Sequence, residues 1–141
     1  MLNKLFIIFT LSFLFASCNK TKSTEKKMDG EWTIYKMKVT KSNGLSYNYE
    51  TTGTFSFSDF NDGEGKYTVN MNYTTPAGTI EKNDSGTIVL KEEGKSFDFF
   101  RINLDGTIDQ IKEGSILLIT NNDIEMMYTE NNENFRFILE K

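Results

Sequence analysis

Residues 29–39 read DGEWTIYKMKV and form the first predicted strand, against which a later strand must close. This segment contains the only tryptophan of the chain, Trp32, and it follows a polar stretch. Trp32 and Ile34 share one face of a β-strand, whereas the alternate residues of 35–39 take the other face. The change of phase after Ile34 predicts a β-bulge, in which one extra residue is inserted into a strand.

Short segments of alternating polarity continue to the C-terminus, without helical periodicity. The further expected strands lie at 45–49, 55–58, 66–73, 79–81, 87–90, 96–104, 107–111, 115–120, 124–129 and 135–139. Turn-forming residues separate them, including NDSG at 83–86 and EG at 113–114, and Gly53 indicates a break or a bulge. A second change of phase, between Phe99 and Phe100, predicts another bulge.

The number and spacing of these strands favour an all-β fold. About eight to ten short strands joined by short turns are typical of an antiparallel barrel or sandwich. No connection is long enough to return a strand across the sheet, so an up-and-down order is favoured over a Greek key. We therefore expect residues 29–141 to form one antiparallel up-and-down β-barrel.

The N-terminus has the features of a lipoprotein signal. Lys4 supplies a positive start, residues 5–16 are mostly apolar, and FASC at 15–18 resembles the lipobox of bacterial lipoproteins. We expect residues 1–17 to be removed and Cys18, the only cysteine, to carry fatty acyl chains such as palmitate. The alternatives are an ordinary secretory signal followed by a chance cysteine, or an uncleaved N-terminal anchor.

Residues 19–27 contain no apolar side chain. Such a segment has nothing to bury, so residues 18–28 are expected to be a lipid anchor followed by a flexible linker between membrane and domain. Asn19 differs from the aspartate that resembles an inner-membrane retention signal. The expected location is therefore the outer membrane of a bacterial envelope, in either leaflet.

Composition excludes several classes of function. The chain has 16 basic and 20 acidic residues, a net charge of −4, which argues against a nucleic-acid partner. It also has no histidine and only one cysteine, which excludes histidine-dependent triads, Cys–His pairs and the usual zinc or copper sites. We expect a protein that is not an enzyme and that uses no cofactor.

The acidic clusters of the sequence are interpreted as turns. Asp59, Asn61, Asp62 and Glu64 bring oxygen atoms together in one loop, but their spacing does not match that of an EF-hand. The adjacent carboxylates at 92–93 lack the evidence of a cleft that a catalytic pair requires. No metal site and no catalytic residue is therefore predicted.

A set of mainly aromatic side chains is expected to point into the barrel. The set is Tyr47, Tyr49, Phe55, Phe57, Tyr67, Val69, Met71 and Tyr73. These side chains would either line a cavity that holds an apolar ligand through buried area, or fill a solid core. The tyrosines favour the cavity, because each hydroxyl needs a hydrogen-bond partner that a ligand or a trapped water supplies.

The Gly30-x-Trp32 pair resembles the G-x-W motif that opens the first strand of lipocalins. The mature domain is similar to the lipocalin-like lipoproteins of Bacteroidetes. The other shared segments are GTFSF at 53–57, GKY at 65–67, ILLIT at 116–120 and FRFILEK at 135–141. This resemblance implies a calycin-like barrel and an apolar ligand. In lipocalins a basic side chain of the last strand covers the first-strand tryptophan, and the resemblance gives that role to Arg136.

The sequence thus predicts a membrane-anchored, lipocalin-like protein that binds a small hydrophobic or amphipathic ligand in the bacterial envelope. The alternative is a structural or interaction lipoprotein, whose solid barrel presents its surface to a protein partner. An open or a filled barrel interior distinguishes the two.

Overall fold

The structure is a computed structural model that describes residues 20–103 and 105–141 of the 141-residue chain. The predicted signal at 1–17 and Cys18 lie outside the described residues. In the described part, a helix covers 20–28 and nine strands follow it. The strands are β1 (Gly30–Thr40), β2 (Ser46–Tyr49), β3 (Thr51–Asn61), β4 (Glu64–Thr75), β5 (Gly78–Lys91), β6 (Ser96–Ile102), β7 (Ile108–Ile119), β8 (Asp123–Glu130) and β9 (Glu133–Glu140). A 3₁₀ turn, η1 (Glu92–Gly94), joins β5 to β6.

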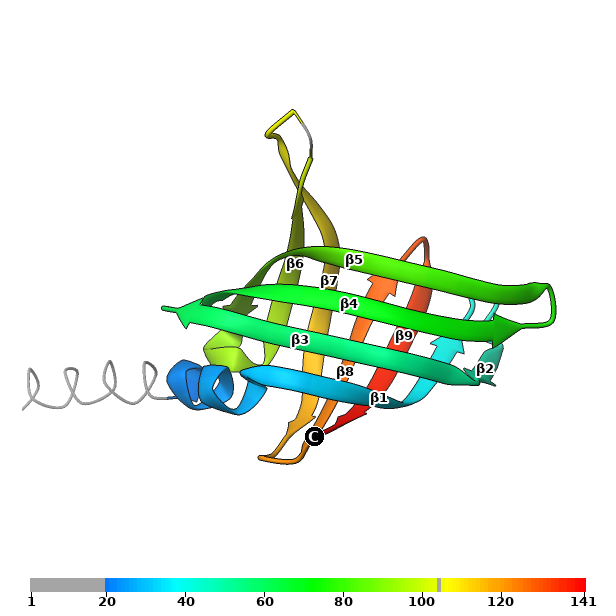
Figure 1. The fold of residues 1–141 in the computed structure, drawn as a ribbon, viewed down its shortest axis with the longest axis horizontal. Coiled ribbons are helices and arrows are strands. Elements are labelled where there is room, and N and C mark those ends of the chain that lie inside the picture. Colours follow the sequence, from blue (N-terminus) through cyan, green and yellow to red (C-terminus); the bar gives the residue numbers. More distant parts are fainter. Residues whose placement is uncertain (1–19, 104) are drawn as a thin grey trace, which may run out of the picture.

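The strands form a closed up-and-down barrel (Figure 1). Each strand from β3 to β9 is antiparallel to the next, and β1 closes the barrel by pairing with both β3 and β9. β2 and β3 flank Glu50 and pair with different parts of β1, so they act as one interrupted strand. Counted in this way, the described residues form a closed eight-stranded antiparallel barrel, and the predicted fold class is confirmed. No helix within the described residues is long and apolar enough to cross a membrane.

Two β-bulges reset the alternation where the sequence predicts them. The register between β1 and β9 shifts after Ile34, and Tyr35 is left 66% exposed. Trp32 and Met37, on either side of the bulge, are consequently both buried in the interior. The register between β6 and β7 shifts in the same way at residues 99–100.

Two predicted turns are wrong, because their residues lie inside long strands. Residues 83–86 belong to β5, and residues 113–114 belong to β7. A side chain at Gly86 would start 1.9 Å from a backbone oxygen of β6, and one at Gly114 would start 2.2 Å from the ring of Phe97. These glycines therefore permit close packing within the barrel wall rather than reversal of the chain.

Apolar side chains fill the barrel at the end where β1 begins. The buried side chains here include Trp32, Ile34, Phe55, Phe57, Ile88, Phe97, Ile124, Met126, Phe137 and Leu139. Their rings are in direct contact, and the ring centroids of Phe55 and Phe137 are 5.1 Å apart. This end is a packed core that stabilises the barrel through buried apolar area.

The helix at 20–28 covers this packed end of the barrel (Figure 1). Met28 is fully buried, and its backbone oxygen accepts a 2.7 Å hydrogen bond from the indole N–H of Trp32. Thr24 is buried against η1. The carboxylate of Glu25 accepts a 2.5 Å hydrogen bond from a backbone N–H of the turn between β3 and β4.

The prediction of a flexible linker is therefore wrong for residues 20–28. This segment shows no apolar periodicity, because the helix docks through a methionine, a threonine and hydrogen bonds rather than through an apolar face. These contacts exist only once the barrel has assembled, so the segment taken alone carries no signal of them.

Candidate functional site

Charged side chains gather inside the barrel wall between β5, β6, β7 and β8. We define the charge cluster as Lys82, Asp84, Arg101, Lys112 and Glu130. Directly opposite residues of paired strands share a face, and Asp84 lies opposite a buried valine of β4. The lysine of β7 in the cluster lies opposite a buried phenylalanine of β6. Both charged groups therefore face the interior.

Asp84 is the centre of the charge cluster. Its carboxylate is 2% exposed and accepts hydrogen bonds from Lys112 Nζ at 2.6 Å and from Arg101 Nη2 at 2.8 Å. Burial by itself would raise the pKa of this carboxyl, but the two cationic donors outweigh that effect and hold the pKa below its ordinary value. Asp84 is therefore ionised and held in place from two sides.

Lys112 is the most enclosed cation of the cluster. Its side chain is 2% exposed, and its Nζ lies 3.6 Å from a carboxylate oxygen of Glu130. The ammonium also lies over the ring of Tyr128, 5.3 Å from the centroid. Glu130 pairs in addition with Lys82. The cluster thus has three cations for two carboxylates, an excess of one positive charge.

Two buried tyrosines border the cluster. Tyr67 is 1% exposed, and its hydroxyl has no hydrogen-bond partner among the described residues. Burial raises the pKa of Tyr67, and the negative charge of Asp84 raises it further. Burial also raises the pKa of Tyr128 well above its ordinary value. Both phenols are neutral at physiological pH, so the Tyr67 hydroxyl is a hydrogen-bond donor that lies close to the Asp84 carboxylate.

The barrel wall opens beside the cluster. β5 pairs with β4 from residue 78 to 89, but it pairs with β6 only over residues 87–91. Beyond this short pairing, the hairpin of β6 and β7 projects away from the barrel (Figure 1). A surface cleft of about 500 Å³ lies at this opening. Its lining residues are Thr68, Asn70, Asn83, Asp84, Ser85 and Arg101.

Tyrosines line the rim of the barrel at the end opposite the helix. Tyr47 lies opposite a buried valine near the end of β1, and its ring is 6.0 Å from that of Tyr49. Tyr49 in turn lies 5.8 Å from Tyr73. Glu130 ends β8 beside this rim, so the charge cluster extends from the rim into the wall.

The eight predicted interior residues differ in how far they are buried. Phe55, Phe57, Tyr67, Val69 and Met71 are buried. Tyr49 and Tyr73 are partly buried, whereas Tyr47 is 41% exposed. It faces the interior but lies at the rim, where no strand covers it. The role of the eight residues in ligand binding stays a prediction.

The predicted contact between Arg136 and Trp32 is wrong. Arg136 pairs with Glu125 of β8, and in the register of β1 and β9 it lies opposite Lys38, about 20 Å along the strand from the indole. The ammonium of Lys141 instead lies over the Trp32 ring, 4.7 Å from the centroid. A cation does cover the tryptophan, but it comes from beyond the last strand.

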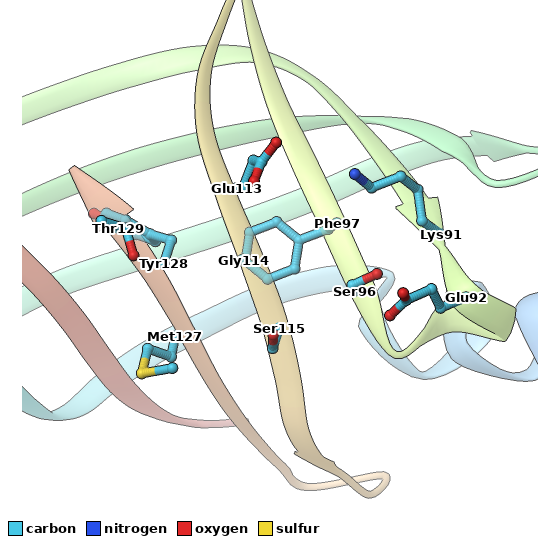
Figure 2. Close-up of a pocket in the computed structure, with 10 residues that line it drawn as sticks. All are labelled: Lys91, Glu92, Ser96, Phe97, Glu113, Gly114, Ser115, Met127, Tyr128 and Thr129. Atoms are coloured by element: carbon cyan, nitrogen blue, oxygen red, sulfur yellow. The ribbon is translucent and has the colours of Figure 1, made fainter.

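A second surface cleft, of about 340 Å³, lies over β5 to β8 (Figure 2). Its lining residues are Lys91, Glu92, Ser96, Phe97, Glu113, Gly114, Ser115, Met127, Tyr128 and Thr129. The side chains of Lys91, Glu92 and Glu113 are solvated at its border. Because water screens these charges, they would attract a charged ligand less strongly than the buried charge cluster does.

Sequence reasoning missed the charge cluster. Asp84 was not recognised as an interior residue because a turn was predicted at 83–86. Lys112 was not recognised because a connection was predicted at 113–114. One signal was present, since Lys82, Asp84, Ile88 and Leu90 occupy alternate positions of one segment. Two charges in phase with apolar residues indicate charges that face a core.

Similarity to solved structures confirms the barrel and nothing finer. No protein-family model and no curated protein matches the sequence. A redesigned β-barrel, b11L5F_LGL, is 13% identical to this chain with a TM-score of 0.52. The match covers 84% of this chain and 94% of the redesigned chain. A second redesigned β-barrel, mFAP0 bound to DFHBI, is 13% identical to this chain with a TM-score of 0.52. That match covers 82% of this chain and 99% of the redesigned chain. At such low identity, these similarities establish only that the chain folds as a β-barrel.

Proposed function

We propose that this protein is a lipid-anchored, non-enzymatic lipoprotein of the bacterial outer membrane, similar to lipocalins, whose barrel binds a small amphipathic molecule with an anionic group. The observation that carries the ligand proposal is Lys112, a lysine 2% exposed within a cluster that has one excess positive charge. Burial of an ion pair contributes little to stability compared with apolar packing, whereas buried charges are concentrated at functional sites. The redesigned barrel mFAP0, which is bound to DFHBI, is a barrel of this fold that holds a small molecule.

The geometry suggests how such a molecule would bind. Its anionic group would enter at the opening between β5 and β6, where Arg101 is half-exposed, and would join Lys112 and the Tyr67 hydroxyl. Its apolar part would lie along the tyrosines of the rim, Tyr47, Tyr49 and Tyr73. A ligand that buries roughly 300 Å² of apolar area gains on the order of 7 kcal/mol before the costs of association. Micromolar binding therefore requires the charge-assisted contacts of the anionic group in addition.

A fluorescent fatty acid and the corresponding fatty alcohol test this proposal. The parent protein is expected to bind the acid with micromolar affinity, and to bind the alcohol at least about tenfold more weakly, because only the acid offers a carboxylate to the ammonium of Lys112. The double variant Asp84→Leu/Lys112→Met is expected to lose this preference, because it lacks that buried donor. It removes both partners of the buried pair, so it should remain folded by near-ultraviolet circular dichroism.

Lys66→Met is the matched control, since Lys66 forms an ion pair with Asp59 on the surface and is 71% exposed. It is expected to leave the preference for the acid unchanged. If the parent binds neither probe, the binding proposal is overturned. The packed aromatic core would then favour the second candidate function, a solid barrel that presents its surface to a protein partner.

The lipid anchor is tested separately. Cys18→Ala is expected to move the protein from the membrane fraction to the soluble fraction, or to leave an uncleaved precursor, because stable anchoring requires the acyl chains on Cys18. Fractionation with immunoblotting measures both outcomes. A processed Cys18→Ala variant that remains in the membrane fraction would rule out the lipoprotein proposal. Separation of inner and outer membranes on a density gradient tests the proposed location.

A further inference from the structure

We infer that the helix end of the barrel rests on the lipid surface, with Leu117 and Leu118 in contact with the bilayer. This inference rests on the acylation of Cys18 proposed above, and adds a fixed orientation of the barrel on the membrane. The occupant of this surface is the bilayer that carries the anchor.

Leu117 and Leu118 are presented to solvent by a β-bulge. They are 48% and 50% exposed, although they lie in the middle of an apolar run. The register between β7 and β8 shifts between Ile116 and Leu118, so Leu117 is the extra residue. Ile116 and Ile119 pack against the core, and the two leucines between them face outward. The bulge thus exposes Leu117 and Leu118 side by side on the surface, and we call this pair the apolar step.

The N-terminal helix lies beside this apolar step. A groove of about 280 Å³ is lined by Lys20, Thr24 and residues 116–119, together with η1. Lys20 is the first described residue and is two positions after Cys18. Two residues span at most about 7 Å, so acyl chains on Cys18 would hold this groove at the membrane surface.

The contacts of the helix at 20–28 fix its direction relative to the barrel. The helix is held by the buried Met28, by the hydrogen bond of Glu25 and by an ion pair of 2.7 Å between Lys20 and Glu93. The helix that begins at Lys20 and the leucines therefore belong to one packed unit. Exposed lysines at positions 22 and 26 can keep their ammonium groups among the lipid phosphates.

Labelling of a single introduced cysteine tests the inference. An acylated Cys18 has no free thiol, so Leu118→Cys and Ile80→Cys each provide one labelling site. Ile80 is the matched control, because it is 42% exposed and lies on β5 next to the β4–β5 turn, on the far side of the barrel from the helix. Each purified lipoprotein is labelled with a nitrobenzoxadiazole dye and reconstituted into phosphatidylcholine vesicles that contain nitroxide-labelled lipid.

The dye at position 118 is expected to be quenched at least about twofold more strongly than the dye at position 80, because only a side chain in contact with the bilayer meets the nitroxide. Equal quenching of the two would overturn the inference. A dye at 118 that is shielded from solvent but not quenched would also overturn it, since another chain segment or a protein would then cover the leucines.

Washing the vesicles with carbonate distinguishes failure of the lipid anchor from failure of the proposed orientation. Release of the parent protein would overturn the anchor, and the orientation with it. Retention of the parent with equal quenching at 118 and 80 would overturn the orientation alone.

Discussion

Replacement of Asp84 by asparagine is expected to lower the free energy of unfolding by about 3–5 kcal/mol, because it leaves a buried ammonium without its main counterion. Lys112 is 2% exposed and would lose its partner at 2.6 Å. The remaining carboxylate, Glu130, lies 3.6 Å away and is shared with Lys82. Urea unfolding at pH 7, followed by the fluorescence of Trp32, measures the change.

Asp59→Asn is the control for this experiment. Asp59 pairs with Lys66 at 2.7 Å, but their side chains are 62% and 71% exposed. Removal of such a surface pair is expected to change stability by about 0–1 kcal/mol. Equal stability of the two asparagine variants would contradict the prediction. It would mean that the buried Lys112 does not need Asp84 as a counterion for the protein to be stable.

The pH dependence gives the same experiment a second readout. The pKa of Asp84 is lowered in the folded protein from its ordinary value of 3.8. Its contribution to stability is therefore complete above the ordinary pKa and is lost as the pH falls toward the lower, folded pKa. The difference between the parent and Asp84→Asn should accordingly narrow below about pH 4, as measured by urea unfolding at several pH values.

Replacement of Gly53 by alanine is expected to destabilise the protein by about 3 kcal/mol or more, since it combines backbone strain with a steric clash. Gly53 has φ +132, a conformation that L residues rarely adopt. A Cβ atom at this position would lie 2.1 Å from the backbone oxygen of Asn70, so β3 and β4 would have to separate. The midpoint of urea unfolding measures the loss.

Gly78→Ala isolates the contribution of the clash. Gly78 has φ +127, but nothing lies within 4 Å of the position where its Cβ would be placed. The substitution is expected to cost only the backbone strain, about 1–2 kcal/mol. Equal destabilisation by the two substitutions would show that β3 and β4 separate at Gly53 without cost.

Local sequence patterns predicted the barrel but only part of the candidate site. The bulge after Ile34 was predictable, because a change in the alternation of apolar residues reports directly on the backbone. The rim position of Tyr47 was not, because alternation predicts the face of a strand and not how far along the barrel a residue lies. Gly86 and Gly114 were misinterpreted as turn residues, since a glycine needed for close packing has the same local signature as a glycine in a turn.

The sequence by itself determined the class of fold, since period-two alternation with short turns allows a chain of this length few alternatives to an antiparallel barrel. Only the tertiary structure decided what lies at its two ends and in its wall. The helix at 20–28 forms against a barrel end that exists only after β1 has paired with β9. Asp84 and Lys112 are 28 positions apart and meet because three successive strands fold back on one another. Alternation reports which side chains face inward, whereas the partners of a buried charge depend on strand register, which only the assembled barrel sets.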